Sequence, residues 1–306
     1  MKGGIITILS PDENKSKEIA LKFGKLQDSG DILMYYRKQG DYILSTLVPK
    51  EYPSSIINSI KASSLSNKII IVHNEYLDWR DGELLLLANS TGTKSLATHS
   101  DTDKLKKLIE SSNLSNIEIN RFLDEKSNIE AVEPRYEKFV YIDRSFTVKG
   151  VGAVMLGFSF MDIKVHDTLI ALPSMQRVEI KNIQVLDEDQ VSVNPGVRIG
   201  IALRNVKAED VKDTYALVPD ENNIKNNIKD ELIKYPWSEI KLGSTYHFIA
   251  GGISVTGIIK AYENREIDVE LSKPIPNIKR IIIADVNAKN RKPRIIGYLN
   301  TNFNKV

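Results

Sequence analysis

The sequence contains no cysteine in its 306 residues. A disulfide framework and a thiolate-ligated metal site are therefore both excluded. Histidine is also scarce, and the four histidines are dispersed along the chain, so they predict no metal site. No Ser-His-Asp triad or pair of catalytic carboxylates stands out. We accordingly expect neither a metal nor another cofactor.

Long apolar runs are missing as well. The run Ile5–Leu9 near the N-terminus is too short for a signal peptide or a membrane span. We therefore expect a cytoplasmic protein with no membrane partner. The formal net charge of +2 does not by itself indicate a nucleic-acid-binding protein.

The distribution of charge is more informative than its sum. Between residues 279 and 294 the chain carries six cations against a single acid, Asp285. The cations are Lys279, Arg280, Lys289, Arg291, Lys292 and Arg294. A solvated hairpin rim is one interpretation of such a run. Contact with phosphates is the other, and the near-absence of interleaved acids favours it.

The first third of the chain alternates strand and helix patterns. Short apolar runs at Ile5–Leu9, Tyr42–Val48, 68–72 and Glu83–Leu87 predict strands that are covered on both faces. Between them, helices are predicted at Lys15–Lys25, from Pro53 to Ile60 and at Asp101–Ser111. This order predicts a mostly parallel sheet with helices packed on it.

Helix patterns largely disappear after a charged stretch around 124–137, which we interpret as a linker. Short strands separated by turns then extend to Pro219. The apolar alternation that begins at Val178 changes phase at Lys181-Asn182, which predicts a β-bulge. The Asn-rich and Lys-rich stretch 220–229 reads as a second linker, and residues 230–306 are again β, with turns at Gly251-Gly252 and Glu263-Asn264-Arg265.

The predicted fold class is thus α/β followed by all-β: a parallel sheet with helices and then two small β-barrels. The expected domain boundaries are residues 1–133, 136–219 and 230–306.

A resemblance to a known family is carried by the start of the second domain. The segment Ile142–Val154, with Asp143-Arg144 followed by Gly150 and Gly152, resembles the opening of domain two in translational GTPases of the elongation factor Tu class. It is most similar to the selenocysteine-specific elongation factor. Pieces farther along follow in the family's order. They are Lys164–Asp167, with His166 in place of a glycine, Val178–Gln184, Gly196–Gly200, Tyr246–Ile259 and Arg294–Gly297.

The resemblance implies a role for three charged residues of the second domain. Asp143 and Arg144 match the family's Asp-Arg pair, and Arg198 matches the arginine of its Gly-x-Arg loop. In the family such residues form part of the pocket for the aminoacyl end of tRNA, which charge-assisted hydrogen bonds would hold. A buried Asp–Arg pair that ties strands together is an equally open interpretation. The cationic residues 279–294 would meet RNA phosphates in the third domain.

The residues that a GTPase uses to hold nucleotide look degenerate here. The family's phosphate loop falls on Leu9–Ser16, where only Lys15 and Ser16 match the motif's lysine and hydroxyl. Leu9 and Asn14 replace its two glycines, and Asp12 and Glu13 bring carboxylates to a site that should attract phosphate. We do not expect this loop to bind phosphate.

Two further GTPase motifs are also altered. The Asp-x-x-Gly motif is expected at Val48–Glu51, which lacks both the aspartate and the glycine, and Tyr52 follows where the family has a catalytic histidine. The guanine-reading motif is expected at Asn89–Gly92, where only the asparagine matches. We therefore predict a pseudo-GTPase that is not an enzyme.

The sequence predicts a translation-associated protein that binds tRNA or ribosomal RNA through its two barrels, not DNA, without GTP. The chain ends at Val306, so the C-terminal mRNA-binding domain of the selenocysteine factor is expected to be missing. Two alternatives stay open. One is an active GTPase with an atypical phosphate loop. The other is a scaffold whose first domain docks on the ribosome or on another translation factor, for example through Tyr76 and Trp79.

Overall fold

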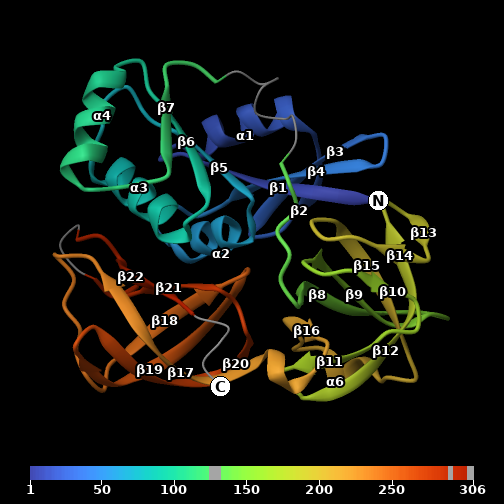
Figure 1. Cartoon of the computed structure of the whole chain (residues 1–306). Helices are drawn as coiled ribbons and strands as arrows, with labels where there is room; N and C mark the ends of the chain where they lie inside the picture. The colour runs from blue at the N-terminus through green and yellow to red at the C-terminus, as the bar shows by residue number, and fades with distance from the viewer. Residues whose placement is uncertain (124–131, 289–291, 302–306) are drawn as a thin grey trace.

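The computed structural model describes residues 1–123, 132–288 and 292–301. Figure 1 shows an α/β domain above two separate β-rich bodies, with the chain passing from the first to the second and then to the third. We call these the α/β domain, the first barrel and the second barrel. The expected fold class, an α/β domain followed by two β-barrels, is confirmed.

The α/β domain is built on a seven-stranded sheet in the order β2-β3-β4-β1-β5-β6-β7. The strands are β1 (Lys2–Leu9), β2 (Lys25–Ser29), β3 (Ile32–Gln39), β4 (Tyr42–Pro49), β5 (Lys68–Val72), β6 (Lys94–Thr98) and β7 (Ile117–Asn120). Strands β4, β1, β5, β6 and β7 run parallel, while β2 and β3 add antiparallel edge strands. The sheet is therefore mostly parallel, as the alternating pattern predicts.

Among the described residues, four helices pack on this sheet. They are α1 (Glu13–Phe23), α2 (Ile57–Leu65), α3 (Trp79–Thr91) and α4 (Thr102–Ser111). The prediction of a strand at Glu83–Leu87 is wrong, because these residues form the middle of α3. All four leucines of this run are buried, since α3 lies between the sheet and the second barrel. A helix that is apolar all round cannot be told from a buried strand by its pattern. The helix predicted from Pro53 begins later, at Ile57.

The first barrel follows the segment 132–139. Its sheet has the order β11-β16-β8-β9-β15-β12-β13, and pairing of β11 with β12 closes six of these strands into a ring. The strands of this sheet are β8 (Val140–Val148), β9 (Gly152–Ser159), β11 (Thr168–Leu172), β12 (Gln176–Val185), β13 (Glu188–Gln190), β15 (Arg198–Arg204) and β16 (Ala216–Val218). A small ladder of β10 (Ile163–Lys164) and β14 (Ser192–Val193) and a short helix, α6 (Ala208–Val211), complete it.

Two features predicted for the first barrel are confirmed. The register of β12 against β15 shifts between Ile180 and Asn182, which places the bulge at Lys181. Gly150 and Gly152 occupy the β8–β9 turn with φ of 83° and 105°, values that side chains rarely adopt. His166, which replaces a family glycine, also has a positive φ of 75°.

The second barrel is closed by the strand order β17-β20-β19-β18-β21-β22. Its strands are β17 (Ile224–Lys234), β18 (Thr245–Ala250), β19 (Ile253–Glu263), β20 (Glu266–Pro276), β21 (Arg280–Ala284) and β22 (Ile295–Asn300). A 3-10 turn, η1 (Glu221–Asn223), precedes β17. The predicted linker 220–229 is therefore wrong from Ile224 onward, because these residues form a strand in which Ile228 is buried while Asn226, Asn227 and Lys229 are exposed.

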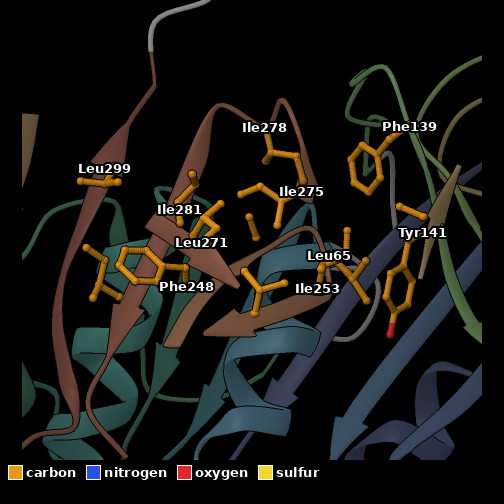
Figure 2. Packing of buried hydrophobic residues seen from close by; sticks show 14 of the residues in the cluster. Leu65, Phe139, Tyr141, Phe248, Ile253, Leu271, Ile275, Ile278, Ile281 and Leu299 are labelled. Atoms are coloured by element: carbon orange, nitrogen blue, oxygen red, sulfur yellow. The ribbon is translucent and has the colours of Figure 1, made fainter. Parts of the chain in front are cut away.

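The three domains meet at one apolar junction. Gly251 and Gly252 form the predicted turn between β18 and β19, with φ of 52° and 82°. A Cβ on Gly252 would lie 2.8 Å from Leu65 of α2 and from Tyr141 of the first barrel. Figure 2 shows Leu65 between Ile253 and Tyr141, so side chains of all three domains share this core. Gly252 also donates its backbone N–H to Ser64 Oγ at 2.9 Å.

In the described part of the chain, no helix is both long and apolar enough to cross a membrane.

Candidate functional site

The connection between β1 and α1 occupies the position of a phosphate loop, at the C-terminal end of a central parallel strand. It contains only residues 10–12, because Leu9 still belongs to β1 and is buried. Asp12 caps the helix: its carboxylate accepts the backbone N–H of Asn14 at 2.9 Å. The helix N-terminus, which would face a phosphate in a nucleotide-binding protein, is thus occupied by the chain's own carboxylate.

The two residues that match the lysine and hydroxyl of a phosphate loop have other partners. Lys15 donates from Nζ to Asn74 Oδ1 in the loop after β5, at 2.8 Å. Ser16 is buried in α1, and its backbone N–H donates to the carbonyl oxygen of Asp12. Asn14 is exposed on the first turn of the helix. These contacts fix the helix start without any ligand.

The guanine-reading motif was predicted in the wrong place. Asn89 and Gly92 lie at the C-terminal end of α3, where Asn89 donates to Tyr235 Oη of the second barrel at 2.9 Å. The loop after β5 is the one that the sheet topology places beside the phosphate-loop position. It begins His73-Asn74-Glu75, and Asn74 accepts the hydrogen bond from Lys15.

This loop is held by internal hydrogen bonds. His73 Nδ1 lies 2.7 Å from Asp81 Oδ1, and both side chains are fully buried. His99, in the loop after β6, lies with Nε2 3.1 Å from the carbonyl oxygen of Glu75. The rings of His73 and His99 approach edge to face at 6.5 Å, so two of the histidines that look dispersed in the sequence are neighbours. The described residues contain no group of three or more side chains suited to hold a metal.

Tyr52 is a packing residue in this structure. It is largely buried, and its hydroxyl donates to the carbonyl oxygen of Arg80 at 2.8 Å. Burial and the nearby Glu83 carboxylate raise the pKa of Tyr52 well above its ordinary value. The Arg294 guanidinium of the second barrel lies 5.8 Å from the ring. Tyr52 therefore lies in the contact between the α/β domain and the second barrel.

The structure brings together the three charged residues predicted in the first barrel. Arg198, on β15, makes a bidentate ion pair with Asp143 of β8, with Nη2 at 3.2 Å from Oδ1. Asp28, on the edge strand β2, joins them: it accepts from Arg144 Nη2 at 3.0 Å and from Arg198 Nη2 at 3.4 Å. Sequence reasoning missed Asp28, because it lies more than a hundred positions away on a strand with no clear apolar alternation.

Burial separates the members of this cluster. The side chains of Arg198, Asp143 and Asp28 are 10%, 14% and 16% exposed, whereas that of Arg144 is 51% exposed. The Arg198 guanidinium also lies 5.5 Å from the centre of the Phe158 ring. The cluster ties the α/β domain to the first barrel and leaves one guanidinium in solvent. Gly196 adds a backbone contact between the same two domains, because a Cβ there would lie 2.1 Å from the carbonyl oxygen of Gly3.

The cationic residues of the second barrel divide into three groups. Arg294 is withdrawn from solvent: it makes a bidentate ion pair with the fully buried Glu83 of α3, with Nη2 at 2.6 Å from Oε2. The prediction that Arg294 contacts RNA is therefore corrected: its side chain links the second barrel to the α/β domain. Lys279 and Lys292 are exposed, and Arg280 is half-buried against Tyr298. Lys289 and Arg291 lie outside the described residues.

An α/β domain of this strand order followed by two six-stranded barrels is the architecture of three-domain elongation factors. The bacterial selenocysteine-specific elongation factor EF-Sec superimposes with a TM-score of 0.76 and 19% identity, covering 98% of this chain and 58% of that chain. Elongation factor SelB from Methanococcus maripaludis, in complex with the GTP analogue GppNHp, gives a TM-score of 0.76 at 17% identity, over 100% of this chain and 80% of that one.

Sequence comparison adds two relatives. An uncharacterized protein of Methanocaldococcus jannaschii is 27% identical over 288 residues, which cover 90% of this chain and 92% of that protein. The selenocysteine-specific elongation factor of the same organism is 33% identical over 85 residues, 28% of this chain and 18% of its own length. No protein-family model matches the sequence. The fold is thus that of the selenocysteine-specific elongation factors.

Proposed function

We propose that this chain is a translation-associated, RNA-binding protein that has the fold of an elongation factor but neither binds nor hydrolyses GTP. The observation that carries the proposal is the occupied phosphate-loop position. Asp12 satisfies the first turn of α1, and Lys15 is bonded to Asn74. A GTP phosphate would have to displace the Asp12 carboxylate and separate Lys15 from its partner, against the repulsion of Asp12 and Glu13.

The loops after β5 and β6 support the same proposal, because hydrogen bonds within the chain already hold them. His99 joins the loop after β6 to the loop after β5, and His73 anchors the latter on Asp81. Without a nucleotide, the arrangement of the three domains needs another source of stability. The ion pairs Arg294–Glu83 and Arg198–Asp28 and the junction at Gly252 supply it.

RNA binding is proposed from the charge of the second barrel. Lys279 and Lys292 are exposed, and Arg280 follows Lys279 in the chain. Exposed cations bind RNA phosphates without base-specific contacts, and their contribution to affinity falls steeply as the salt concentration rises. The half-exposed Arg144 offers the first barrel a guanidinium that can stack on an unpaired base.

Calorimetric titration with GTP and magnesium tests the nucleotide part of the proposal. We expect no heat of binding, while a selenocysteine-specific elongation factor titrated in parallel gives a saturating curve. Stoichiometric binding at micromolar concentration would instead make the chain an active or regulated GTPase with an atypical loop.

In-cell crosslinking of the tagged protein, followed by sequencing of the attached RNA, tests the RNA part. We expect enrichment of tRNA 3′ ends or of one ribosomal RNA site over an untagged control. A profile equal to the control would contradict RNA binding and favour a protein-docking scaffold. The side chains of Tyr76 and Trp79, 81% and 38% exposed, would then be the first to replace.

A further inference from the structure

A cavity of about 660 Å³ lies at the N-terminal ends of β5 and β6, the edge of the sheet opposite the phosphate-loop position. It is open to solvent and is lined by the starts of β5 and β6, the end of α3, residues 132–137, and β21 and β22 of the second barrel. Five cations and three acids line it. They are Lys68, Lys94, Arg135, Lys279 and Arg280, with Glu118, Glu133 and Glu137. Neither the resemblance nor the proposed nucleotide chemistry assigns this cavity a role.

Arg280 is held in one orientation on the wall of this cavity. Its guanidinium lies 4.0 Å from the centre of the Tyr298 ring, a stacking contact that fixes the plane of the group. Gly92, which caps α3 with φ of 67°, makes room for it: a Cβ there would lie 2.3 Å from Nη2. Nη1 is buried and has no hydrogen-bond partner within residues 1–123, 132–288 and 292–301. A buried donor without a partner is unusual, and here it belongs to a permanent cation.

Glu137 supplies an acceptor to the same cavity. The side chain is about nine-tenths buried, and its Oε1 lies 3.4 Å from Arg135 Nε. Its Oε2 has no hydrogen-bond partner in the described chain, and neither has Arg135 Nε. Burial raises the pKa of Glu137, while Arg135 and Lys279 act in the opposite direction. Arg135 is itself positioned by a 2.8 Å bond from Nη2 to the carbonyl oxygen of Ser64.

We infer that this cavity binds a nucleotide unit, with the phosphate on Arg280, Lys279 and Lys94 and a ribose hydroxyl or base amino group donating to Glu137. The positive charges of Arg280, Lys279 and Lys94 attract an anionic group, and a hydrogen-bond donor that reaches the Glu137 carboxylate satisfies its unpaired oxygen. The volume lies within the range of small-ligand pockets, roughly 300–1,000 Å³. The phosphate can belong to a free nucleotide or to the end of an RNA strand. Only the second source rests on the proposed function.

Binding is measured by fluorescence anisotropy of a short labelled single-stranded RNA, and by competition with adenosine monophosphate and with inorganic phosphate. Arg280→Gln and Lys94→Gln each remove one cation from the cavity, and Lys94 is exposed at the first position of β6, so its replacement leaves the core intact. We expect each to weaken binding about tenfold to hundredfold, as for loss of a charged hydrogen bond. Lys260→Gln is the matched control, because Lys260 carries the same charge and pairs with Glu270 on the surface of the second barrel. It should change affinity by less than about twofold.

Glu137→Gln tests the acceptor. The wild type should bind adenosine monophosphate more tightly than inorganic phosphate. In Glu137→Gln the ratio of the two affinities should be smaller, because the amide is a weaker acceptor than a carboxylate. A preference unchanged by Glu137→Gln would overturn the placement of the ribose or base. Thermal melts of all variants show whether they are folded.

The outcomes separate the two proposals. RNA binding that Arg280→Gln and Lys94→Gln leave unchanged overturns the inference but not the proposed function. Binding of adenosine monophosphate without RNA, lost in both variants, supports the cavity with a free nucleotide as its ligand and contradicts RNA binding. If the wild type binds neither probe, both proposals fail.

Discussion

Single charged residues hold the domains of this protein together. Arg294 and Glu83 come from different domains, and the Glu83 side chain has no solvent exposure. The guanidinium also donates to the carbonyl oxygen of Pro53 at 2.9 Å, so the buried charge is paired and hydrogen-bonded. Removing one partner of such a pair leaves an uncompensated charge in a region of low dielectric constant.

Glu83→Gln should therefore lower the free energy of unfolding by about 3 kcal/mol, measured by urea denaturation. Glu231→Gln is the matched control, since the Glu231–Arg265 pair has a similar 2.8 Å separation but side chains that are 61% and 66% exposed. Solvent screens this second pair, and we expect little measurable change. Equal losses in the two variants would show that burial does not determine the strength of the Glu83 contact.

Whether a site residue could be predicted depended on whether it belongs to a local sequence motif. Asp143, Arg144 and Arg198 are recognisable in the sequence because each belongs to a local motif. In the structure Arg198 pairs with Asp143, and Arg144 joins them through Asp28. Asp28 has no such motif and becomes part of the cluster only when β2 lies against the first barrel. Whether the cluster also holds an aminoacyl end stays a prediction.

At the scale of the element, α3 shows how local and tertiary signals compete. Its leucine run reads as a strand, yet the residues before it form a capping box: Asp78 accepts the N–H of Arg80 at 2.8 Å, and Asp81 accepts the N–H of Asp78 at 2.9 Å. Gly92 ends the helix in the left-handed conformation. Helix start and stop signals were thus present, and the apolar run concealed them.

Asp78→Ala should destabilise the protein by about 1 kcal/mol at neutral pH, because it removes the cap. Hydrogen bonds from Arg80 lower the pKa of Asp78 in the folded state. The ionised form thus favours folding: its contribution is present above the unfolded pKa, about 4, and is lost as pH falls through the lower folded value.

The matched control is Asp78→Asn, which keeps a capping oxygen but cannot titrate. Urea denaturation at pH 7 and pH 3 should show the difference between wild type and Asp78→Asn shrinking in acid. A difference that is constant between the two pH values would contradict the assignment of this contribution to Asp78.

At the scale of the whole molecule, the apolar junction makes three domains one cooperative unit. Leu65, Tyr141 and Ile253 belong to different domains and lie in one cluster (Figure 2). Tyr215 of the first barrel reaches Pro274 of the second, donating from Oη to its carbonyl oxygen at 2.5 Å. Calorimetric unfolding should consequently show a single transition.

Gly252→Ala tests the junction, and Gly150→Ala is its control. The two glycines have nearly equal φ, 82° and 83°, but a Cβ meets Leu65 and Tyr141 at 2.8 Å in the first case and nothing within 4 Å in the second. In both variants the free energy of unfolding should fall by about 1–2 kcal/mol, because alanine is strained in the left-handed conformation. Only Gly252→Ala should lose a further 1–3 kcal/mol to overpacking and show a split calorimetric transition. Identical melting curves for the two variants would mean that Leu65 and Tyr141 move aside without a cost in stability.

Local chemistry was enough to determine much of this protein from its sequence. Apolar alternation, turn glycines and the phase change at Lys181 define the barrels, and the altered residues 9–16 predict a loop that does not bind phosphate. These features depend on neighbours close in the chain, so the sequence displays them directly.

Only the tertiary structure decided what depends on contacts between distant segments. It placed Asn89 at the end of a helix and not after a strand, turned Arg294 from an exposed cation into a buried one, and placed Arg280 and Glu137 on the wall of one cavity. Burial and pairing set the energy of a charge, and both are properties of the folded chain that no local pattern encodes.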